Sequence, residues 1–342
     1  MSRLLIAERL TAQALAGAPL HSPEAVAERL LAVQGQDPRG ARLAVRARTE
    51  GLAAADVDRA LSEERSLLIT WLNRGTLHLV RSEDYPWLHA LTAPTLFASC
   101  RRRLQQEGVS ESAGEKAMKT IESALADEGP LGGRDLRARL GLAGIRTEGQ
   151  AFIHLMFLAA ARGIVVRGPM RGKQHAYVLV RDWLGEQQPV DREQALAELA
   201  RRYLVGHGPA DDRDLARWAG LPLRDARAGL TAIASELEQR EDGLVELKGS
   251  PDPAPLPPPR LLGAFDPLLL GWTSREEVVG PHEVLVTTNG IFRPFALAGG
   301  RAVARWGLAG GKVTIEHLGE VRPRDAAALE KDAQRVLEYL GP

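Results

Sequence analysis

The chain has 342 residues, of which 44% are hydrophobic and 26% charged, a globular composition that predicts two or three domain-sized units. No apolar run reaches about 18 residues, which argues against a transmembrane helix. The single cysteine, Cys100, excludes an internal disulfide framework and a cysteine-based zinc site. The net charge of zero counts against a protein that simply coats nucleic acid. We therefore expect a cytoplasmic monomer with no membrane segment, metal or cofactor.

The N-terminal part predicts helices followed by a β-hairpin. Glu8 and Arg9 interrupt the first apolar pattern, which indicates an amphipathic helix rather than a signal peptide. The strings "LLITWL" and "TLHLV", joined by the turn "NRG", predict the hairpin. A long helix follows, with Pro94 inside it. Helices are expected over residues 3–16, 23–33, 37–48 and 55–63. We interpret residues 1–110 as one winged-helix unit with a bridging helix.

An internal repeat follows. Residues 128–142, "EGPLGGRDLRARLGL", and 207–221, "HGPADDRDLARWAGL", share Gly-Pro, Arg-Asp-Leu and Gly-Leu in one ungapped register. A helical pattern precedes each copy. The first copy is followed by a further helix and by two β-type runs, "IVVRGP" and "HAYVLV". Helix, short helix, helix and hairpin is the order of a winged helix-turn-helix. The repeat predicts two such units, at residues 111–185 and 190–250.

The C-terminal part has a different pattern. The proline-rich string "SPDPAPLPPPR" (250–260) predicts a linker. The strings "HEVLVTTNG", "IFRPFALAG", "GRAVARWGLAGG" and "KVTIEHL" alternate as strands do, and Gly-Gly and Asn-Gly pairs separate them. A helix closes the chain. We expect residues 260–342 to form an antiparallel β-rich domain, which makes the whole chain α+β and mainly helical.

Several common catalytic patterns do not fit this sequence. "GLAGGK" lacks the spacing and the Ser or Thr of a phosphate loop, and neither His-Glu-x-x-His nor Gly-x-Ser-x-Gly occurs. His154 lies on an apolar helix face and is expected to be a core residue. Tandem winged helices favour nucleic-acid binding, which leaves three classes open: a DNA-acting enzyme, a non-catalytic DNA-binding protein or transcription regulator, and a protein-interaction scaffold.

Three separated strings carry a resemblance to a known family. "LLAVQGQDPRGARLAVRAR", "TWLNRGTLHLVRSEDYPWL" and "LLGAFDPLLLGW" resemble, in this order, the AlkZ-type winged-helix DNA glycosylases, which include self-resistance enzymes for azinomycin-like alkylating antibiotics. The resemblance implies three tandem winged helices in a C-shaped arrangement with a β-rich C-terminal part. It implies a monofunctional glycosylase without cofactor, whose partner is double-stranded DNA carrying bulky N7-alkylguanine adducts or derived crosslinks.

The catalytic signature of that family is Gln, an apolar residue and Gln. It maps onto Gln34 and Gln36, with Gly35 where the family usually has a larger apolar residue. A guanine alkylated at N7 is already cationic, so it leaves without being protonated. Amide oxygens are then sufficient, because they accept the hydrogens of a water and face an oxocarbenium-like sugar. If the backbone is extended, Gln34 and Gln36 point to the same side. The alternative is that both amides merely end a helix.

Other candidate site residues have two interpretations each. Asp37 is expected to be a helix N-cap or a carboxylate that assists the sugar cation. His78 is expected to face the lesion pocket or to pack under the hairpin. The remaining candidates are basic. The helix opened by Asp37 carries Arg39, Arg42 and Arg46, which are expected to contact phosphates or to form a solvated face. The hairpin tips carry Arg74, Arg171 and Lys173, which are expected to contact the DNA backbone.

Overall fold

The computed structural model describes residues 3–171, 174–281, 283–287 and 289–341. The chain divides into two compact units, of which the first combines residues 1–57 with 196–342 and the second is the continuous segment 58–195. The finer four-part division expected from the sequence stays a prediction. Within the described ranges, every helix is too short or too polar to cross a membrane.

The first unit contains both ends of the chain. Its N-terminal elements are α1 (Arg3–Ala12), α2 (Pro23–Leu30), β1 (Val33–Gln34) and α3 (Pro38–Arg46). Further along the chain come α10 (Arg192–His207), α11 (Asp212–Ala219), α12 (Leu223–Ala232), β6 (Leu237–Gln239) and β7 (Val245–Leu247). These last five elements follow the order helix, helix, helix, hairpin that the repeat predicts. Helix α10 starts in the second unit, and α4 (Ala54–Ser62) also crosses the border between the units.

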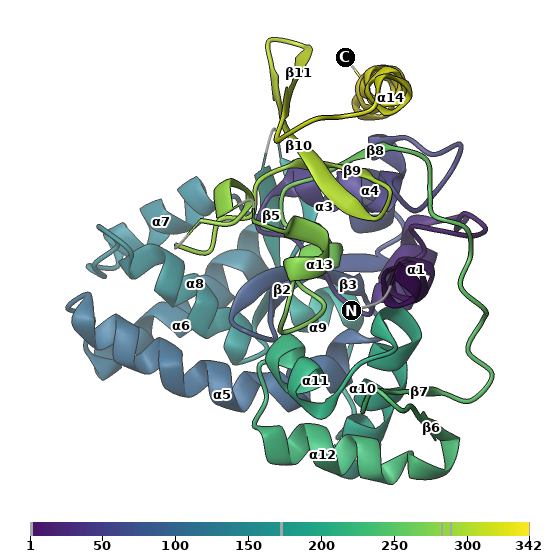
Figure 1. Ribbon diagram of the computed structural model, residues 1–342. Helices are drawn as coiled ribbons and strands as arrows, with labels where there is room; N and C mark the ends of the chain where they lie inside the picture. Colours follow the sequence, from purple (N-terminus) through teal and green to yellow (C-terminus); the bar gives the residue numbers. More distant parts are fainter. Residues whose placement is uncertain (1–2, 172–173, 282, 288, 342) are drawn as a thin grey trace. The chain divides into compact units, whose positions relative to one another are not determined.

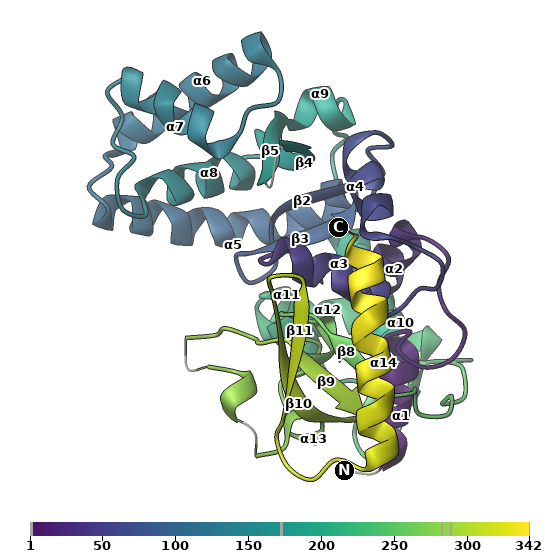
Figure 2. The ribbon, with the colours of Figure 1, turned by 90° about the horizontal axis from the view of Figure 1, so that it is seen from above.

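The C-terminal part of the first unit is a four-stranded antiparallel sheet covered by the last helix. The elements are β8 (Arg260–Leu262), η2 (Pro267–Leu269), α13 (Glu276–Val279), η3 (Glu283–Leu285), β9 (Phe295–Ala298), β10 (Arg301–Ala309), β11 (Lys312–His317) and α14 (Pro323–Leu340). The strand order is β11-β10-β9-β8. In Figure 2, α14 runs beside β8, β9 and β10. The side chains buried between helix and sheet include Leu261, Ala304, Trp306, Leu329 and Val336.

The second unit contains two β-hairpins that pair with each other. Its elements are β2 (Leu67–Leu72), β3 (Thr76–Arg81), α5 (Tyr85–Gln106), α6 (Glu111–Glu128), α7 (Gly133–Leu142), α8 (Ala151–Ala161), β4 (Val165–Arg171), β5 (Gln174–Leu179) and α9 (Val180–Leu184). Its later part, from α6 to β5, follows the order helix, helix, helix, hairpin. Helices α5, α6 and α8 lie side by side in Figures 1 and 2. The two hairpins join where Ile69 of β2 pairs with Arg167 of β4.

Arg167 also explains why the two hairpins adhere. Its guanidinium lies 4.7 Å from the centre of the Trp71 ring and 4.9 Å from that of Tyr177. It also donates to the Tyr177 hydroxyl at 2.8 Å. Cation–π contacts of this kind contribute most when the cation is partly removed from water, as Arg167 is.

Two expectations from the sequence are corrected, and two elements were not expected. The first helix ends at Ala12 rather than at residue 16, because Ala14 adopts a positive φ of 53°. His282, the first residue of the string "HEVLV", lies outside the described residues. The described part does not form the expected strand: residues 283–285 form a 3-10 turn, and an isolated bridge from Val286 to Phe292 follows. The proline before this string removes one backbone donor, and the Asn-Gly turn after it leaves little length for pairing. Strand β6 and helix α9 were not predicted.

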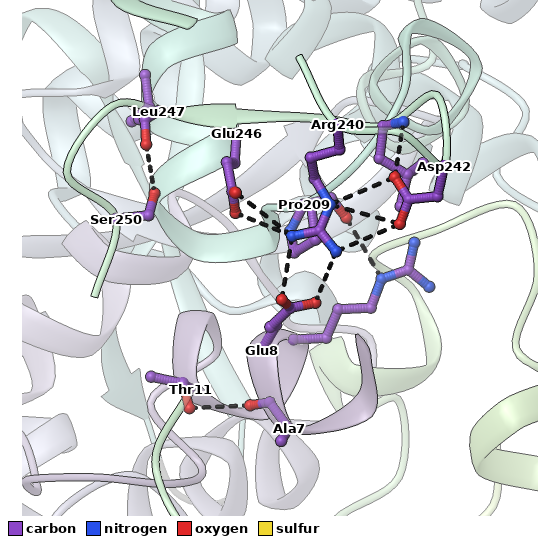
Figure 3. A network of polar contacts seen from close by, with 11 residues as sticks. Ala7, Glu8, Thr11, Pro209, Arg240, Asp242, Glu246, Leu247 and Ser250 are labelled. Carbon is purple, nitrogen blue, oxygen red and sulfur yellow. Dashed lines mark hydrogen bonds and ion pairs between the residues drawn. The ribbon is translucent and has the colours of Figure 1, made fainter. Parts of the chain in front are cut away.

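A network of charges fastens α1 to the β6–β7 hairpin (Figure 3). The Arg240 guanidinium donates to Glu8 of α1 at 3.0 and 3.2 Å, to Asp242 at 3.3 Å and to Glu246 at 3.3 Å. These carboxylates raise the pKa of Arg240. The hairpin that the repeat predicts as a wing is therefore held against a helix from the start of the chain.

Candidate active site

The segment carrying Gln34 and Gln36 lies between α2 and α3. Helix α2 ends at Leu30, and its C-cap, Leu31, is a fully buried residue with a positive φ of 62°. The backbone is then extended through β1 and bends before α3. Gln34 lies in the extended part and is only 6% exposed, whereas Gln36 lies in the bend and is exposed. The expectation of extended backbone therefore applies to Gln34 and not to Gln36.

Asp37 caps helix α3. Its Oδ1 accepts a hydrogen bond from the Gly40 backbone N–H at 2.9 Å, and Pro38 occupies the first helical position. This is the N-cap interpretation of Asp37, and the structure confirms it. The cap fixes where the helix begins, four residues after Gln34 and two after Gln36, and so limits the conformations open to these amides.

The next turn of α3 packs backbone to backbone on residues 263–264. A Cβ built on Gly40 would lie 2.3 Å from the carbonyl oxygen of Ala264, a distance that real Cβ atoms do not reach. From the other side, a Cβ on Gly263 would lie 3.0 Å from the backbone of Gly40. Two of the strings that carry the family resemblance thus touch each other, and glycine is required at this contact.

A buried ion pair holds the far end of α3. Arg48 and Asp266 have no exposed side-chain surface, and the two guanidinium nitrogens lie 2.9 and 3.0 Å from the carboxylate oxygens. Arg48 also donates to the side chain of Gln13 at 2.8 Å and to the carbonyl oxygens of Gln13 and Ala44 at 2.9 Å. Because all five bonds are buried, α3 is fixed at both ends relative to the segment around Asp266.

The three arginines on α3 differ in what they contact. Arg39 is exposed, which suits a phosphate contact. Arg42 is buried and donates to the Pro38 carbonyl oxygen at 2.8 Å. Arg46 binds both carboxylate oxygens of Asp332, at 2.5 and 3.2 Å. Both predictions for Arg46, a phosphate contact and a solvated face, are therefore wrong, because its side chain is only 10% exposed and its charge is paired with Asp332.

A cavity of about 620 Å³ opens at the C-terminal end of α3. Ala47, Thr49, Arg260 and Arg335 are among its lining residues, and Gln34 and Gln36 are not. Arg260 donates to the carbonyl oxygen of Ala47 and so caps the end of the helix. The cavity is therefore at the opposite end of the helix from the two glutamines.

In the second unit, Arg74 and His78 lie where the hairpin prediction placed them. Arg74 is in the turn between β2 and β3, and His78 is a buried residue of β3. Burial, together with the positive charge of Arg74, lowers the pKa of His78 to about 3. The His78 ring is therefore neutral at pH 7, and its Nδ1–H donates to the Thr76 carbonyl oxygen at 2.9 Å. Such a group does not supply a proton to a leaving base.

The second hairpin carries the remaining basic candidates. Arg171 is exposed at the end of β4, donates to the Pro130 carbonyl oxygen at 2.8 Å and lies 4.0 Å from a carboxylate oxygen of Asp135. Lys173 lies outside the described residues. Among the residues with assigned positions, no group of three His, Cys, Asp or Glu side chains is arranged to hold a metal ion.

The sequence reasoning missed the residues that hold α3 in place. Gly40, Arg48 and Asp266 all lie inside the strings quoted for the family, but none of the three is among the candidate residues that the sequence indicates. Arg48 and Asp266 are 218 positions apart, so no local pattern relates them. A signal was available in the sequence, since a single Asp within the apolar string "AFDPLLL" requires a partner if it is buried.

Comparisons with known proteins identify the family and the fold. Residues 27–339 match the family described as DNA glycosylase AlkZ-like. A curated relative from Streptomyces sahachiroi, named an interstrand DNA cross-link repair glycosylase, is 28% identical over 371 aligned positions, covering 99% of this chain and 96% of the relative. The solved structure of Streptomyces sahachiroi DNA glycosylase AlkZ superposes with a TM-score of 0.80 at 24% identity, over 98% of this chain and 96% of that one. The chain belongs to the AlkZ-like family of DNA glycosylases.

Proposed function

We propose that this glycosylase hydrolyses the N-glycosidic bond of bulky N7-alkylguanine in duplex DNA, including guanines joined in interstrand crosslinks, and leaves an abasic site. The name of the Streptomyces relative, an interstrand cross-link repair glycosylase, supports this substrate class. Family membership favours an enzyme over the non-catalytic regulator and the scaffold. The biological role would be DNA repair or self-resistance to a genotoxic natural product.

The observation that carries the proposal is the buried side chain of Gln34 in β1, four residues before a helix that is fixed at both ends. The C1′–N9 bond breaks, and its electron pair returns to the cationic base, which leaves neutral. Water then bonds to C1′ and loses a proton to solvent. The side-chain carbonyl oxygens of Gln34 and Gln36 share two tasks: one orients this water, and the other faces the developing sugar cation. Since their side chains differ in exposure, Gln34 is assigned to the sugar and Gln36 to the water.

The chemistry assigns secondary roles to other residues. A leaving base that is already cationic needs no general acid, and a neutral His78 is consistent with that requirement. Asp37, which caps α3, adds negative charge beside the glutamines. Arg39, Arg74 and Arg171 are proposed to contact DNA phosphates. Arg42 is proposed to support α3 instead, because it is buried against Pro38.

We extend the proposal to the architecture. The helix, helix, helix, hairpin order of α6–β5 and of α10–β7 supports their assignment as winged-helix units, with a third unit near the N-terminus. The enzyme is proposed to act as a cytoplasmic monomer on double-stranded DNA.

The test is release of free base from a duplex containing one 7-methylguanine. The wild-type protein should release it, and Gln34→Ala and Gln36→Ala should each lower the single-turnover rate by about 100-fold or more, the size of effect seen when one preorganised electrostatic group is removed. Gln334→Ala, on the exposed face of α14, is the control and should retain the full rate. If both active-site variants release base at the wild-type rate, the glutamines are not catalytic.

A further inference from the structure

The cavity at the C-terminal end of α3 contains a positive charge that the proposed mechanism does not use. The cavity has a volume of about 620 Å³, and all of its lining residues belong to the first unit. Its walls come from the end of α3, the segment before β8 and one face of α14. A space of this size accommodates a small molecule such as a nucleotide. The charged side chains in the walls determine which chemistry fits.

Three guanidinium groups in the lining have two buried carboxylates between them. Arg46 binds Asp332, and Arg48 binds Asp266. Among the described residues, no carboxylate forms an ion pair with the third, Arg260, whose one hydrogen bond goes to a backbone carbonyl oxygen at the end of α3. This group of five side chains therefore has one positive charge in excess, and the charge belongs to Arg260.

The environment of Arg260 favours an added anion. Its side chain is half-buried, and burial lowers the pKa of Arg260 below the ordinary value for arginine. The attraction of Asp332 opposes this effect, whereas the positive charges of Arg48 and Arg46 lower the pKa further. A guanidinium nevertheless keeps its proton at neutral pH. The backbone carbonyl at the helix end offers only a partial negative charge, so an anion in the cavity would stabilise this cation.

Two further carboxylates in the lining do not neutralise Arg260. Glu50 and Glu338 are both exposed, and neither forms an ion pair with it. Water and dissolved salt screen charges in such exposed positions. Arg335, also exposed, adds a cation to the same wall, so arginines outnumber carboxylates in the described lining.

The shape of the guanidinium selects the kind of anion. It carries five N–H donors in one plane, and the described residues provide a single acceptor for those of Arg260. Phosphate and carboxylate oxygens match such donors through paired, charge-assisted hydrogen bonds. A phosphate offers more acceptor oxygens than a carboxylate. The volume of the cavity also leaves room for an organic group attached to the phosphate.

We infer that the cavity at the end of α3 binds a phosphate group through Arg260. The phosphate belongs to a soluble nucleotide or to a strand of DNA, two sources that present the same chemistry to the cavity. The inference does not require the proposed hydrolysis of a glycosidic bond. Because Arg260 also caps α3, a phosphate bound there would stabilise the helix that follows Gln34 and Gln36 in the chain.

The first test measures binding of thymidine 5′-monophosphate to the full-length protein by isothermal titration calorimetry. Thymidine is the probe without phosphate, and neither probe contains the guanine of the proposed substrate. The wild type should bind the nucleotide and not the nucleoside. Arg260→Gln should weaken nucleotide binding by about 10- to 150-fold, the effect of losing charge-assisted hydrogen bonds. Arg301→Gln, an exposed arginine on β10 outside the cavity, is the matched control and should bind like the wild type.

A second variant tests the cavity without touching the cap of α3. Pro258 is an exposed residue of the lining, and Pro258→Asp places a carboxylate in the wall while Arg260 keeps its hydrogen bond. Repulsion between like charges should weaken nucleotide binding by about fivefold or more. Pro258→Ala, which adds no charge, should not change it. Nucleotide binding that is equally strong in the wild type, Arg260→Gln and Pro258→Asp lies elsewhere on the protein and overturns the inference.

The salt dependence of binding to undamaged duplex distinguishes the two sources of phosphate. If a DNA strand supplies the phosphate, Arg260→Gln and Pro258→Asp should each reduce the slope by about 1, and thymidine 5′-monophosphate should compete with the duplex. If a soluble nucleotide supplies it, both variants keep the wild-type slope and lose only nucleotide binding. Each result supports the inference. Variants that change neither measurement overturn it, whether or not the wild type releases 7-methylguanine, so the inference and the proposed function fail separately.

Discussion

Arg48 is the residue on which the position of α3 depends most. Its charge is buried without exposed surface, and Asp266 is the carboxylate that neutralises it. Asp266→Asn should therefore lower the free energy of unfolding by about 3–5 kcal/mol, because it leaves a buried cation without its counter-ion. Urea denaturation followed by circular dichroism measures this. The matched change in an exposed pair, Glu64→Gln opposite Arg59, should stay within about 1 kcal/mol of wild type. Equal effects in the two variants would contradict the role given to Arg48.

His78 makes the stability depend on pH. Its pKa is about 3 in the folded protein, whereas an unfolded histidine titrates near about 6.5. Between these two pKa values the unfolded chain binds a proton at His78 that the folded chain excludes. The contribution of His78 to the free energy of unfolding therefore falls as the pH drops from about 6.5 towards 3, and it is constant above about 6.5. His78→Gln should reduce this slope. Denaturation at pH 7.5, 6.0 and 5.0 measures it, and parallel slopes for variant and wild type would contradict the assignment.

At the scale of elements, Arg240 fastens the β6–β7 hairpin to α1. Arg240→Ala would leave Glu8, Asp242 and Glu246 close together without a cation, and like charges repel. We expect faster amide hydrogen exchange in β6, β7 and α1, with little change in the β8–β11 sheet. Arg305→Ala is a suitable control, since Arg305 on β10 faces only Glu316 and is more exposed. Exchange that rises evenly over the first unit would show that the network does not act locally.

The order of elements was predictable from the sequence because its signals are local. Asp37 caps its helix as predicted, a local Ser-Pro signal caps α2 at Ser22, and the Gly-Gly pairs lie between β9, β10 and β11. The contacts that fix the candidate site are not local. The local pattern predicts a phosphate contact or a solvated face for Arg46, because its partner Asp332 lies 286 positions away and leaves no local signal. The close approach of Gly40 to Ala264 also gives no local signal, since a glycine inside a helix has several explanations.

At the scale of the whole molecule, the net charge of zero limits how DNA is held. Three arginines, Arg39, Arg74 and Arg171, are proposed to contact phosphates. At a slope of about −0.9 per contact, a fourfold rise in salt should weaken binding to undamaged duplex on the order of 40-fold. Arg39→Ala should reduce the slope by about 1. Fluorescence anisotropy over a salt series measures both. Arg335→Ala, an exposed arginine on α14, should leave the slope unchanged; a change would place the DNA elsewhere.

The discontinuous first unit has a consequence for synthesis of the protein on the ribosome. Asp266 is translated 218 residues after Arg48, which takes roughly 10 to 45 seconds at about 5–20 residues per second. During this time Arg48 has no counter-ion, Gly40 has no backbone to pack on, and α3 is held by its cap and by the hydrogen bonds from Arg48 to Gln13. The glutamines are thus positioned only when most of the chain has emerged. A nascent or prematurely terminated chain would carry the Gln-Gly-Gln motif without a finished enzyme that could cut bases from DNA.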